Sequence, residues 1–478
     1  MLKKISSLFL LLVLCSCASN RVQTHSGYSD IYTEMSEINL ADNQNFRVGV
    51  LLPLSGELSR QGNGLKNATM MALEDINDKN LILQYYDTKG TPSGASVAIE
   101  NAINQEAQLI IGPMLSSSVQ AISSRAKDKN IPVIAFSSSS EVLQEGIYSM
   151  GLLLDEQVDR VITYASKQGR TRFALLLPDN NTGITVARSA VKSAQKNGAK
   201  VVSIAFYKSG TTDFSKILRQ MTNYDERSAN LEKEKLKYTS LVEMGNPTAI
   251  AKMKELEKLD TLGGVDFDAV LIPDFGATLK SAVAMFGYYD VFSPDVKFIG
   301  TSIWDNTLLN KETTMRGSWY PSLSRQNSSY FVNKYSDLFG ERPSSLYSFG
   351  YDAVALASAV SRNGTDNLAE KITDSGGYLG INGVFRFFSN GQNQHSLDIK
   401  EVRDSGNFIV DAAPRKFSAD TSVAYDVDEE TTYYKPEIWG KDRQTAELMI
   451  YGKILPENIE LDVSEDAYSE ISEEIKEF

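Results

Sequence analysis

The sequence predicts an α/β protein with two doubly wound lobes, because apolar runs of strand length alternate with helical patterns through most of its 478 residues. The first unit shows this best. Residues 47–54 form a continuous apolar run, which Pro53 and Gly56 end. Leu65 to Ile76 then repeats apolar side chains at helical spacing. In doubly wound sheets ligands bind beyond the carboxyl ends of the strands, so we look for function in the loop 54–64.

Short apolar runs at 82–87, 107–111 and 131–136 predict the next strands of the first lobe. The last two are followed by serine clusters, at 116–118 and 137–140. Serine hydroxyls donate and accept hydrogen bonds, and a helix N-terminus beside them suits a carboxylate or another small anion. Serine caps are also routine, so one cluster alone would be uninformative. Two clusters at successive strand ends favour a ligand-facing surface.

A second run of strands and helices begins at about residue 152 and predicts a second α/β lobe. Its strands are expected at 172–177, 201–206 and 267–273. Residues 225–260 interrupt this rhythm with a charged stretch that is broken at Gly245-Asn246-Pro247. That pattern predicts two amphipathic helices in a hairpin, which is either a solvated insertion or a partner-binding surface.

The expected lobe boundaries are 46–151 with 298–366 for the first lobe, and 152–297 with 377–416 for the second. Residues 383–388 and 397–402 predict closing antiparallel strands, with a turn at Ser389-Asn390-Gly391.

Beyond residue 416 the sequence changes in kind. Aromatic residues stand in a polar stretch, and the chain ends in an acidic run. We expect 417–478 to be an acidic, partly disordered tail whose aromatic part is able to dock on the body.

The first 16 residues predict a lipoprotein signal peptide. Two lysines precede an apolar stretch, Leu8 to Leu14, which is too short for a mature transmembrane span. The stretch ends in Leu14-Cys15-Ser16-Cys17, which resembles a bacterial lipobox with Cys17 as the lipidated residue. The alternative is an ordinary secretory signal with an incidental cysteine.

Residues 17–45 are polar, lack apolar periodicity and are expected to tether the body to lipid. In the sorting pattern of bacterial lipoproteins, Ala18 in place of an aspartate after the lipidated cysteine indicates the outer membrane.

Composition argues against several classes of function. Both cysteines lie in the signal segment, so the mature chain is expected to have neither a disulfide nor a cysteine-based site. The formal net charge of -13 argues against a nucleic-acid partner. Only His25 and His395 are present, with neither a G-x-S-x-G nor a G-x-x-x-x-G-K motif. We therefore expect a non-enzymatic protein without a metal or a cofactor.

Several motifs together resemble the Leu/Ile/Val-binding protein family, which belongs to the type I periplasmic binding proteins. They are RVGVLLPLSGELSRQGNGLKNATMMALEDIN, IIGPMLSSSVQA, IPVIAFSSSS, KSGTTDF, FDAVLIPDFGATLKSAVAMFGYYD, FIGTSIWD, SFGYDAVALASAV and GINGVFRFFSNG. The resemblance covers about residues 46–416, and the combination is specific where no single piece would be. It implies two Rossmann-like lobes joined by a hinge.

Within that superfamily, the lipobox, the IPDFGATL and TSIWD segments and the helical insertion look most like bacterial penicillin-binding protein activators. This resemblance implies a lipid-anchored periplasmic protein of the outer membrane that regulates a peptidoglycan synthase. The alternative is an amino-acid substrate-binding protein that delivers its ligand to the permease of an ABC transporter.

The resemblance to amino-acid binders also implies site residues. Their serine after the third strand matches Ser116, and the two groups after the fourth strand match Ser137 and Ser139. Together these would hold a ligand carboxylate. The acid of the second lobe that pairs with the ligand ammonium falls near Asp274.

Two positions depart from the amino-acid binders. The aromatic residue of their first loop falls at Gln61, and a tyrosine of their second lobe falls near Thr182. The carboxylate half of the pocket is therefore kept, whereas the half that holds the ligand side chain is altered. This disfavours a branched-chain amino acid and leaves a different small amino-acid-like ligand or an unoccupied cleft.

Overall fold

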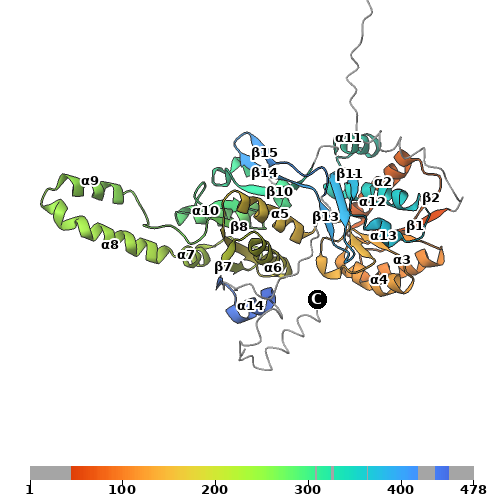
Figure 1. Cartoon of the computed structure of the whole chain (residues 1–478), viewed down its shortest axis with the longest axis horizontal. Helices are drawn as coiled ribbons and strands as arrows, with labels where there is room; N and C mark the ends of the chain where they lie inside the picture. The colour runs from red at the N-terminus through yellow and green to blue at the C-terminus, as the bar shows by residue number, and fades with distance from the viewer. Residues whose placement is uncertain (1–44, 307–308, 325–327, 363, 418–435, 452–478) are drawn as a thin grey trace, which may run out of the picture. The chain divides into compact units, whose positions relative to one another are not determined.

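The computed structural model describes residues 45–306, 309–324, 328–362, 364–417 and 436–451 (Figure 1). Three sheets organise these residues: one of five strands, one of eight strands and one of three strands. The two larger sheets are mainly parallel, and helices cover both of their faces. The predicted α/β class with two doubly wound lobes is confirmed.

The five-stranded sheet forms the first lobe, in the order β2-β1-β3-β4-β5. All of its pairs are parallel. The strands are β1 (Phe46–Leu52), β2 (Leu81–Asp87), β3 (Leu109–Ile111), β4 (Val133–Ala135) and β5 (Ile147–Ser149). The helices between them are α2 (Ser59–Ile76), α3 (Pro92–Asn104) and α4 (Ser116–Asp128). The strand order reverses between β1 and β3, which is where doubly wound sheets place their ligands.

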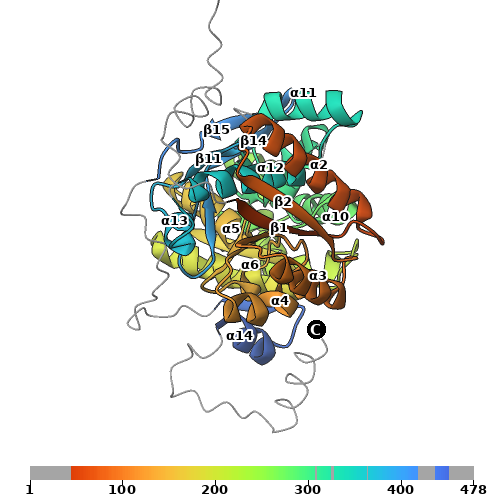
Figure 2. The same ribbon diagram turned by 90° about the vertical axis from the view of Figure 1, so that its right-hand side faces the viewer.

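Helices from much later in the sequence complete this lobe, and Figure 2 shows two of them, α11 and α12, beside α2. They are α11 (Ser328–Phe339), α12 (Ser345–Ser361) and the short α13 (Leu368–Ile372). The carboxylate of Asp75 in α2 accepts hydrogen bonds from Tyr330 (3.1 Å) and Tyr351 (2.9 Å), and it also pairs with Lys334. Gly64 lies so close to the Tyr347 ring that a Cβ there would meet a ring carbon at 2.0 Å.

The eight-stranded sheet forms the second lobe, in the order β15-β14-β10-β9-β8-β6-β7-β16. Its strands are β6 (Arg172–Pro178), β7 (Lys200–Tyr207), β8 (Ala269–Leu271), β9 (Lys297–Ile299), β10 (Trp319–Leu323), β14 (Leu397–Arg403), β15 (Gly406–Asp411) and β16 (Glu437–Trp439). Helices α5 (Leu154–Lys167) and α6 (Asn181–Lys196) pack in one apolar core. Helices α7 (Ser215–Met221) and α10 (Gly276–Tyr288) pack in the core of the other face.

Four short 3-10 turns complete the connections: η1 (Ser140–Val142), η2 (Ser302–Asn306), η3 (Leu309–Lys311) and η4 (Thr313–Met315).

The lobe boundaries differ from the sequence expectation after residue 297. Strand β10 and all but the first residue of β9 fall in the range 298–366 that we assigned to the first lobe, yet both strands pair within the second sheet. The chain returns to the first lobe only with α11. Strand–helix alternation identifies strands but does not say which sheet each one joins, and here the antiparallel partner β14 holds β10 in the second sheet.

The small antiparallel sheet consists of β11 (Tyr378–Gly380), β12 (Gly383–Phe387) and β13 (Asn393–His395). The strands predicted at 383–388 and 397–402 are both present in antiparallel pairs, but they do not pair with each other. Strand β12 pairs with β13, whereas β14 pairs with β10 and β15. The turn at Ser389-Asn390-Gly391 connects β12 to β13, a three-residue strand that is too short to show a periodic pattern.

The predicted helical hairpin is confirmed. Helix α8 (Tyr224–Glu243) and helix α9 (Pro247–Leu256) pack against each other and are joined at Gly245-Asn246, as the sequence predicts (Figure 1). The Asn246 side chain caps α9 by accepting from the N–H groups of Thr248 (3.0 Å) and Ala249 (3.2 Å). Helices α8 and α9 each bury only two side chains, so most of the hairpin surface is exposed.

One part of the C-terminal region docks on the second lobe. Strand β16 lies parallel to β7 at the edge of the sheet, and α14 (Arg443–Tyr451) packs against α6. The signal peptide, residues 17–44 of the predicted tether (with Cys17), and residues 418–435 and 452–478 of the tail lie outside the described residues. Within the described ranges, no helix has the length and apolar character that a membrane crossing requires.

Candidate functional site

The loops that follow β3 and β4 lie side by side at one edge of the first sheet. The N–H of Gly112 donates to the carbonyl of Ile134 (2.8 Å), and the N–H of Phe136 donates to the carbonyl of Pro113 (3.0 Å). These bonds continue the pairing of the two strands into their loops. The structure therefore brings the two serine clusters together at adjacent strand ends.

Ser116 is the first residue of α4, a helix whose start has no side-chain cap. Its side chain is half-buried, and its hydroxyl has no hydrogen-bond partner among the described residues. The first N–H groups of a helix lack partners within the helix and carry a partial positive charge. This end of α4 therefore offers a hydroxyl and free amides to an anion.

The other two predicted serines shape the loop after β4. The Ser137 hydroxyl is buried and accepts from the N–H of Ser139 (3.1 Å). The Ser137 carbonyl accepts from the hydroxyl of Ser149 on β5. The Ser139 hydroxyl accepts from the N–H of Glu141 (3.4 Å) and starts η1. Ser137 therefore stabilises the conformation of the loop, whereas Ser139 is only half-buried and lies nearer to solvent.

Gln61 lies in the first turns of α2, and its Oε1 atom is buried without a hydrogen-bond partner in the described structure. Asp87 at the end of β2 holds the preceding loop: its carboxylate accepts from the N–H of Leu54 (2.9 Å) and from the hydroxyl of Ser55 (2.6 Å). Burial would raise the pKa of Asp87, but these bonds, with one from the N–H of Lys89, hold that pKa below its usual value. Sequence reasoning missed this acid because a single aspartate at a strand end carries no pattern.

Asp274 follows β8 in the second lobe. Its carboxylate accepts from the Tyr207 hydroxyl (2.7 Å) and from the N–H of Phe275 (2.7 Å), while its carbonyl accepts from the Trp304 indole (2.9 Å). Burial, and then the bond to Asp274, raise the pKa of Tyr207. Asp274 is half-buried and has no cationic partner among the described residues. Its negative charge is therefore available to an ammonium group.

The structure also places two further residues. Thr182, which the resemblance aligned with a tyrosine of the amino-acid binders, lies exposed in the first turn of α6. Tyr207 is the last residue of β7, one residue beyond the strand that we expected at 201–206, and from this position its hydroxyl reaches Asp274.

Across the described ranges, no group of three or more His, Cys, Asp or Glu side chains is arranged to hold a metal ion.

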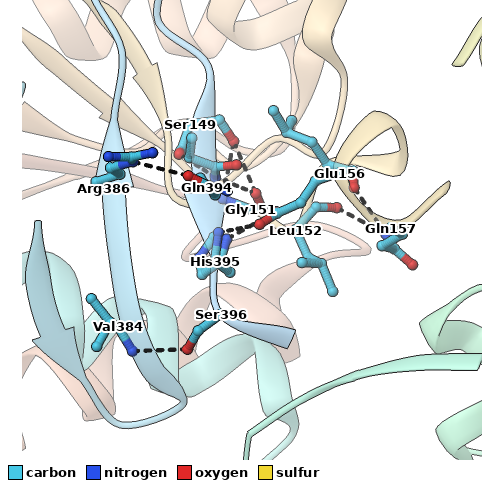
Figure 3. Close-up of polar contacts among 12 residues, drawn as sticks. Ser149, Gly151, Leu152, Glu156, Gln157, Val384, Arg386, Gln394, His395 and Ser396 are labelled. Atoms are coloured by element: carbon cyan, nitrogen blue, oxygen red, sulfur yellow. Dashed lines mark hydrogen bonds and ion pairs between the residues drawn. The ribbon is translucent and has the colours of Figure 1, made fainter. Parts of the chain in front are cut away.

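The junction of the lobes is tied together by polar contacts from β13 and α5 (Figure 3). The Asn393 side chain donates to the carbonyls of Ser149 (2.6 Å) and Gly151 (2.7 Å), where the chain leaves β5 for α5. The Gln157 side chain donates to the Leu152 carbonyl (3.3 Å) and accepts from the N–H of Ser302 (2.9 Å). These bonds fix the route between the two sheets.

His395 is part of the same junction. Its Nδ1 atom lies 3.3 Å from Glu156, and the carboxylate of Glu156 also accepts from the backbone N–H of His395. Burial raises the pKa of Glu156, and the neighbouring His395 opposes that shift. The imidazole packs beside the rings of Phe349 and Phe385, with centroid distances of 5.6 and 6.0 Å.

Comparison with known proteins supports the same architecture. Residues 45–231 match the model of the family described as periplasmic binding protein. In structure, the chain is similar to a Rhodospirillum rubrum protein named for branched-chain amino acid ABC transport, with a TM-score of 0.59, 15% identity, and coverage of 77% of this chain and 100% of that one. The chain has the type I periplasmic binding protein fold.

A second solved structure has the same fold, and a curated protein is similar in sequence. An ABC transporter substrate-binding protein from Sphaerobacter thermophilus has a TM-score of 0.57 and 17% identity, covering 78% of this chain and 98% of its own. The Leu/Ile/Val-binding protein of Citrobacter freundii is 25% identical over 198 residues, which are 39% of this chain and 54% of that protein. The chain thus spans about half the length of the curated relatives it matches. The Sphaerobacter thermophilus and Citrobacter freundii proteins are both named as binding proteins.

Proposed function

We propose that this protein is a non-catalytic solute-binding protein that closes its two lobes on a small amino-acid-like ligand. The observation that carries the proposal is the hydrogen-bonded pair of loops after β3 and β4, which places Ser116 and Ser139 on adjacent strand ends. An uncapped helix start with a free hydroxyl suits a carboxylate. Asp274, on the other lobe, suits the ammonium group of the same ligand.

The proposal includes a location and a partner. We propose that this protein works in the periplasm, where Cys17 anchors it to lipid. We also propose that it delivers its ligand to the permease of an ABC transporter. The names of the similar proteins support this reading. The resemblance aligns Gln61 and Thr182 with aromatic residues of the amino-acid binders, so we propose a smaller or more polar amino acid than a branched-chain one as the ligand.

Binding of amino acids to single-residue variants tests this function. Ser116→Ala and Asp274→Ala are each expected to weaken binding about tenfold or more, because each removes a charge-assisted hydrogen bond. Ser117→Ala is the matched control, since Ser117 is exposed on the same helix turn. The absence of any thermal stabilisation by the twenty common amino acids at millimolar concentration would contradict the proposal.

A second function, regulation of a peptidoglycan synthase as a penicillin-binding protein activator, is supported by the α8–α9 hairpin. This hairpin exposes three large apolar side chains, Leu236 (72%), Leu241 (40%) and Met244 (81%). Its base is held by the buried guanidinium of Arg227, which donates to the carbonyls of Gly263 and Tyr289 (both 3.0 Å) and to the hydroxyl of Thr261 (2.7 Å). A helical hairpin that is anchored at its base and exposes apolar side chains suits binding to a protein partner.

Pull-down with a purified penicillin-binding protein separates this second function from the first. The double substitution Leu236→Ser and Met244→Ser is expected to abolish capture and stimulation of the synthase, while amino-acid binding is unchanged. Leu338→Ser is the control, because Leu338 is 50% exposed on α11, far from the hairpin in sequence. Capture that persists after deletion of 225–260 would rule out the hairpin as the binding surface.

A further inference from the structure

A polar hollow of about 200 Å³ lies where four separate parts of the chain meet. It is lined by Ser140 and Glu141 of η1, Asp155 of α5, four residues of α6 and Gln392 of the turn before β13. None of the residues proposed above to hold the ligand between the lobes is among them. Pockets that bind drug-sized ligands measure about 300–1,000 Å³, so this smaller hollow suits a single smaller solute.

The hollow carries charges of both signs. Arg188 and Lys192 on one face of α6 supply two positive charges, while Glu141 and Asp155 supply two carboxylates from other elements. Burial raises the pKa of Asp155, although the Ser140 hydroxyl, Lys192 and Arg188 oppose the shift. Hydroxyls of Ser140, Thr185 and Ser189 complete the lining.

Bonds to neighbouring elements fix two sides of the hollow. The Nε–H of Arg188 donates to the carbonyl of Met449 in α14 (2.7 Å), which orients the guanidinium. The Ser189 hydroxyl donates to the carbonyl of Asp155 (3.1 Å) and joins α6 to α5. Charged groups that are held before a ligand arrives lose less entropy when it binds.

We propose that this hollow is a second binding site, which takes a small zwitterion such as a free amino acid. The carboxylate of the zwitterion lies beside Arg188 and Lys192, and its ammonium group lies beside Glu141 and Asp155. Opposite charges paired in this way suit a zwitterion, whereas a simple anion or cation would meet one pair of like charge. The inference goes beyond the proposed function, because the site shares no side chain with the cleft.

The hollow is lined by both lobes, so a ligand bound there affects how the lobes are arranged. Its lining comes from the first lobe through η1, from the second lobe through α5 and α6, and from the small sheet through Gln392. A ligand that contacts both lobes favours the arrangement of the lobes that it fits. Occupancy of the hollow is therefore coupled to ligand affinity in the cleft, and the coupling is reciprocal.

Calorimetry on the full chain with L-alanine, L-leucine and L-glutamate tests the site. The background is the double variant Ser116→Ala and Asp274→Ala, so that remaining binding reports the hollow. Adding Lys192→Ala is expected to weaken that remaining binding about tenfold or more. Lys196→Ala is the matched control, because Lys196 lies one turn further along α6, 3.7 Å from Asp159 and outside the hollow.

One more variant, and a comparison of the wild type with the background variant, distinguish the possible results. Glu141→Gln, an exposed change on the other lobe that preserves shape, is expected to weaken binding by a similar factor. If the cleft holds no ligand, the wild type and the background variant bind alike, and Lys192→Ala still weakens both. Binding that is unchanged by Lys192→Ala and by Glu141→Gln, or a background variant that binds none of the three amino acids at millimolar concentration, overturns the proposal.

Discussion

The hydroxyl of Tyr207 donates a hydrogen bond of 2.7 Å to the carboxylate of Asp274, and so joins the ends of β7 and β8. Tyr207 is buried, so its ring fixes the donor while Asp274 remains half-buried. The acid that we propose for the ligand ammonium is therefore oriented by the core of the second lobe. A side chain held in this way presents its free lone pairs in one direction.

Replacement of Tyr207 by phenylalanine tests that orientation. Tyr207→Phe keeps the ring and removes one hydrogen bond to a charged group, so we expect the free energy of unfolding to fall by about 1.5–3 kcal/mol. Amino-acid binding is expected to weaken as well, because Asp274 loses its fixed direction. Urea unfolding and calorimetry measure the two effects. Tyr288→Phe, at a side chain that is 68% exposed, is the control. Unchanged binding in Tyr207→Phe would mean that Asp274 is held by other contacts.

The buried carboxyl of Glu156 predicts a pH-dependent stability. Burial raises its pKa above the usual 4.5, so the folded protein holds this proton at pH values where the unfolded chain has released it. The contribution of this proton to the free energy of unfolding is fully present below about pH 4.5, and it is lost as the pH rises through the pKa of Glu156 in the folded protein. We expect Glu156→Gln to flatten this fall, so that the variant gains stability relative to the wild type as the pH rises.

Urea unfolding at several pH values from 4.5 to 8 measures the difference. The titratable groups that face this carboxyl are His395 and Asp159, and a glutamine can still accept the hydrogen bond from the backbone N–H of His395. Glu145→Gln, at an exposed position, is the control. A constant difference across the range would show that the proton on Glu156 is not linked to folding.

The approach of α2 to α12 predicts a strongly destabilising glycine replacement. Gly64→Ala would place a Cβ 2.0 Å from the Tyr347 ring, and the two helices have to separate to accept it. We expect a loss of about 1–3 kcal/mol. Gly287→Ala in α10 is the matched control, because its Cβ meets no atom within 4 Å. That change is expected to stabilise by about 0.5–1 kcal/mol through helix propensity. Equal effects of the two changes would argue against this contact.

The docking of β16 and α14 predicts a cost of shortening the chain. A protein that ends after residue 417 loses four buried side chains of the second-lobe core, namely Ile438, Ala446, Ile450 and Tyr451. At about 1.5–3 kcal/mol for each large apolar side chain, we expect a loss of several kcal/mol and a lower midpoint of thermal unfolding. A chain that ends after Tyr451 keeps both elements and serves as the control. Equal midpoints for the two proteins would contradict this role.

The fold was predictable where a pattern runs over many residues. The apolar run at 47–54, the helical spacing that follows it and the charged hairpin at 225–260 all gave the correct element. The adjacency of the two serine loops also followed, because successive strands of a doubly wound sheet tend to lie side by side. Short elements such as β13 and β16 were missed, since three residues do not make a period.

The candidate site was predictable in part. The resemblance led to Ser116, Ser137, Ser139, Gln61 and Asp274. Sequence spacing did not show which of the serine hydroxyls form hydrogen bonds within their own loop and which remain open to a ligand. Ser137 is buried and bonded to Ser139, whereas Ser116 is free among the described residues. Tyr207 and Asp87 were missed because their partners lie 67 and 32 residues away and only the folded sheets bring them together.

The last strand of the second sheet comes from near the end of the chain. Ribosomes make proteins from the N-terminus, so β7 exists long before β16 is synthesised to lie against it. Until then the backbone N–H and C=O groups along that side of β7 are open to pairing with any other strand. A growing chain therefore has an unpaired edge on β7 until β16 is made and pairs with it. A chaperone that shields this edge would improve the yield of folded protein.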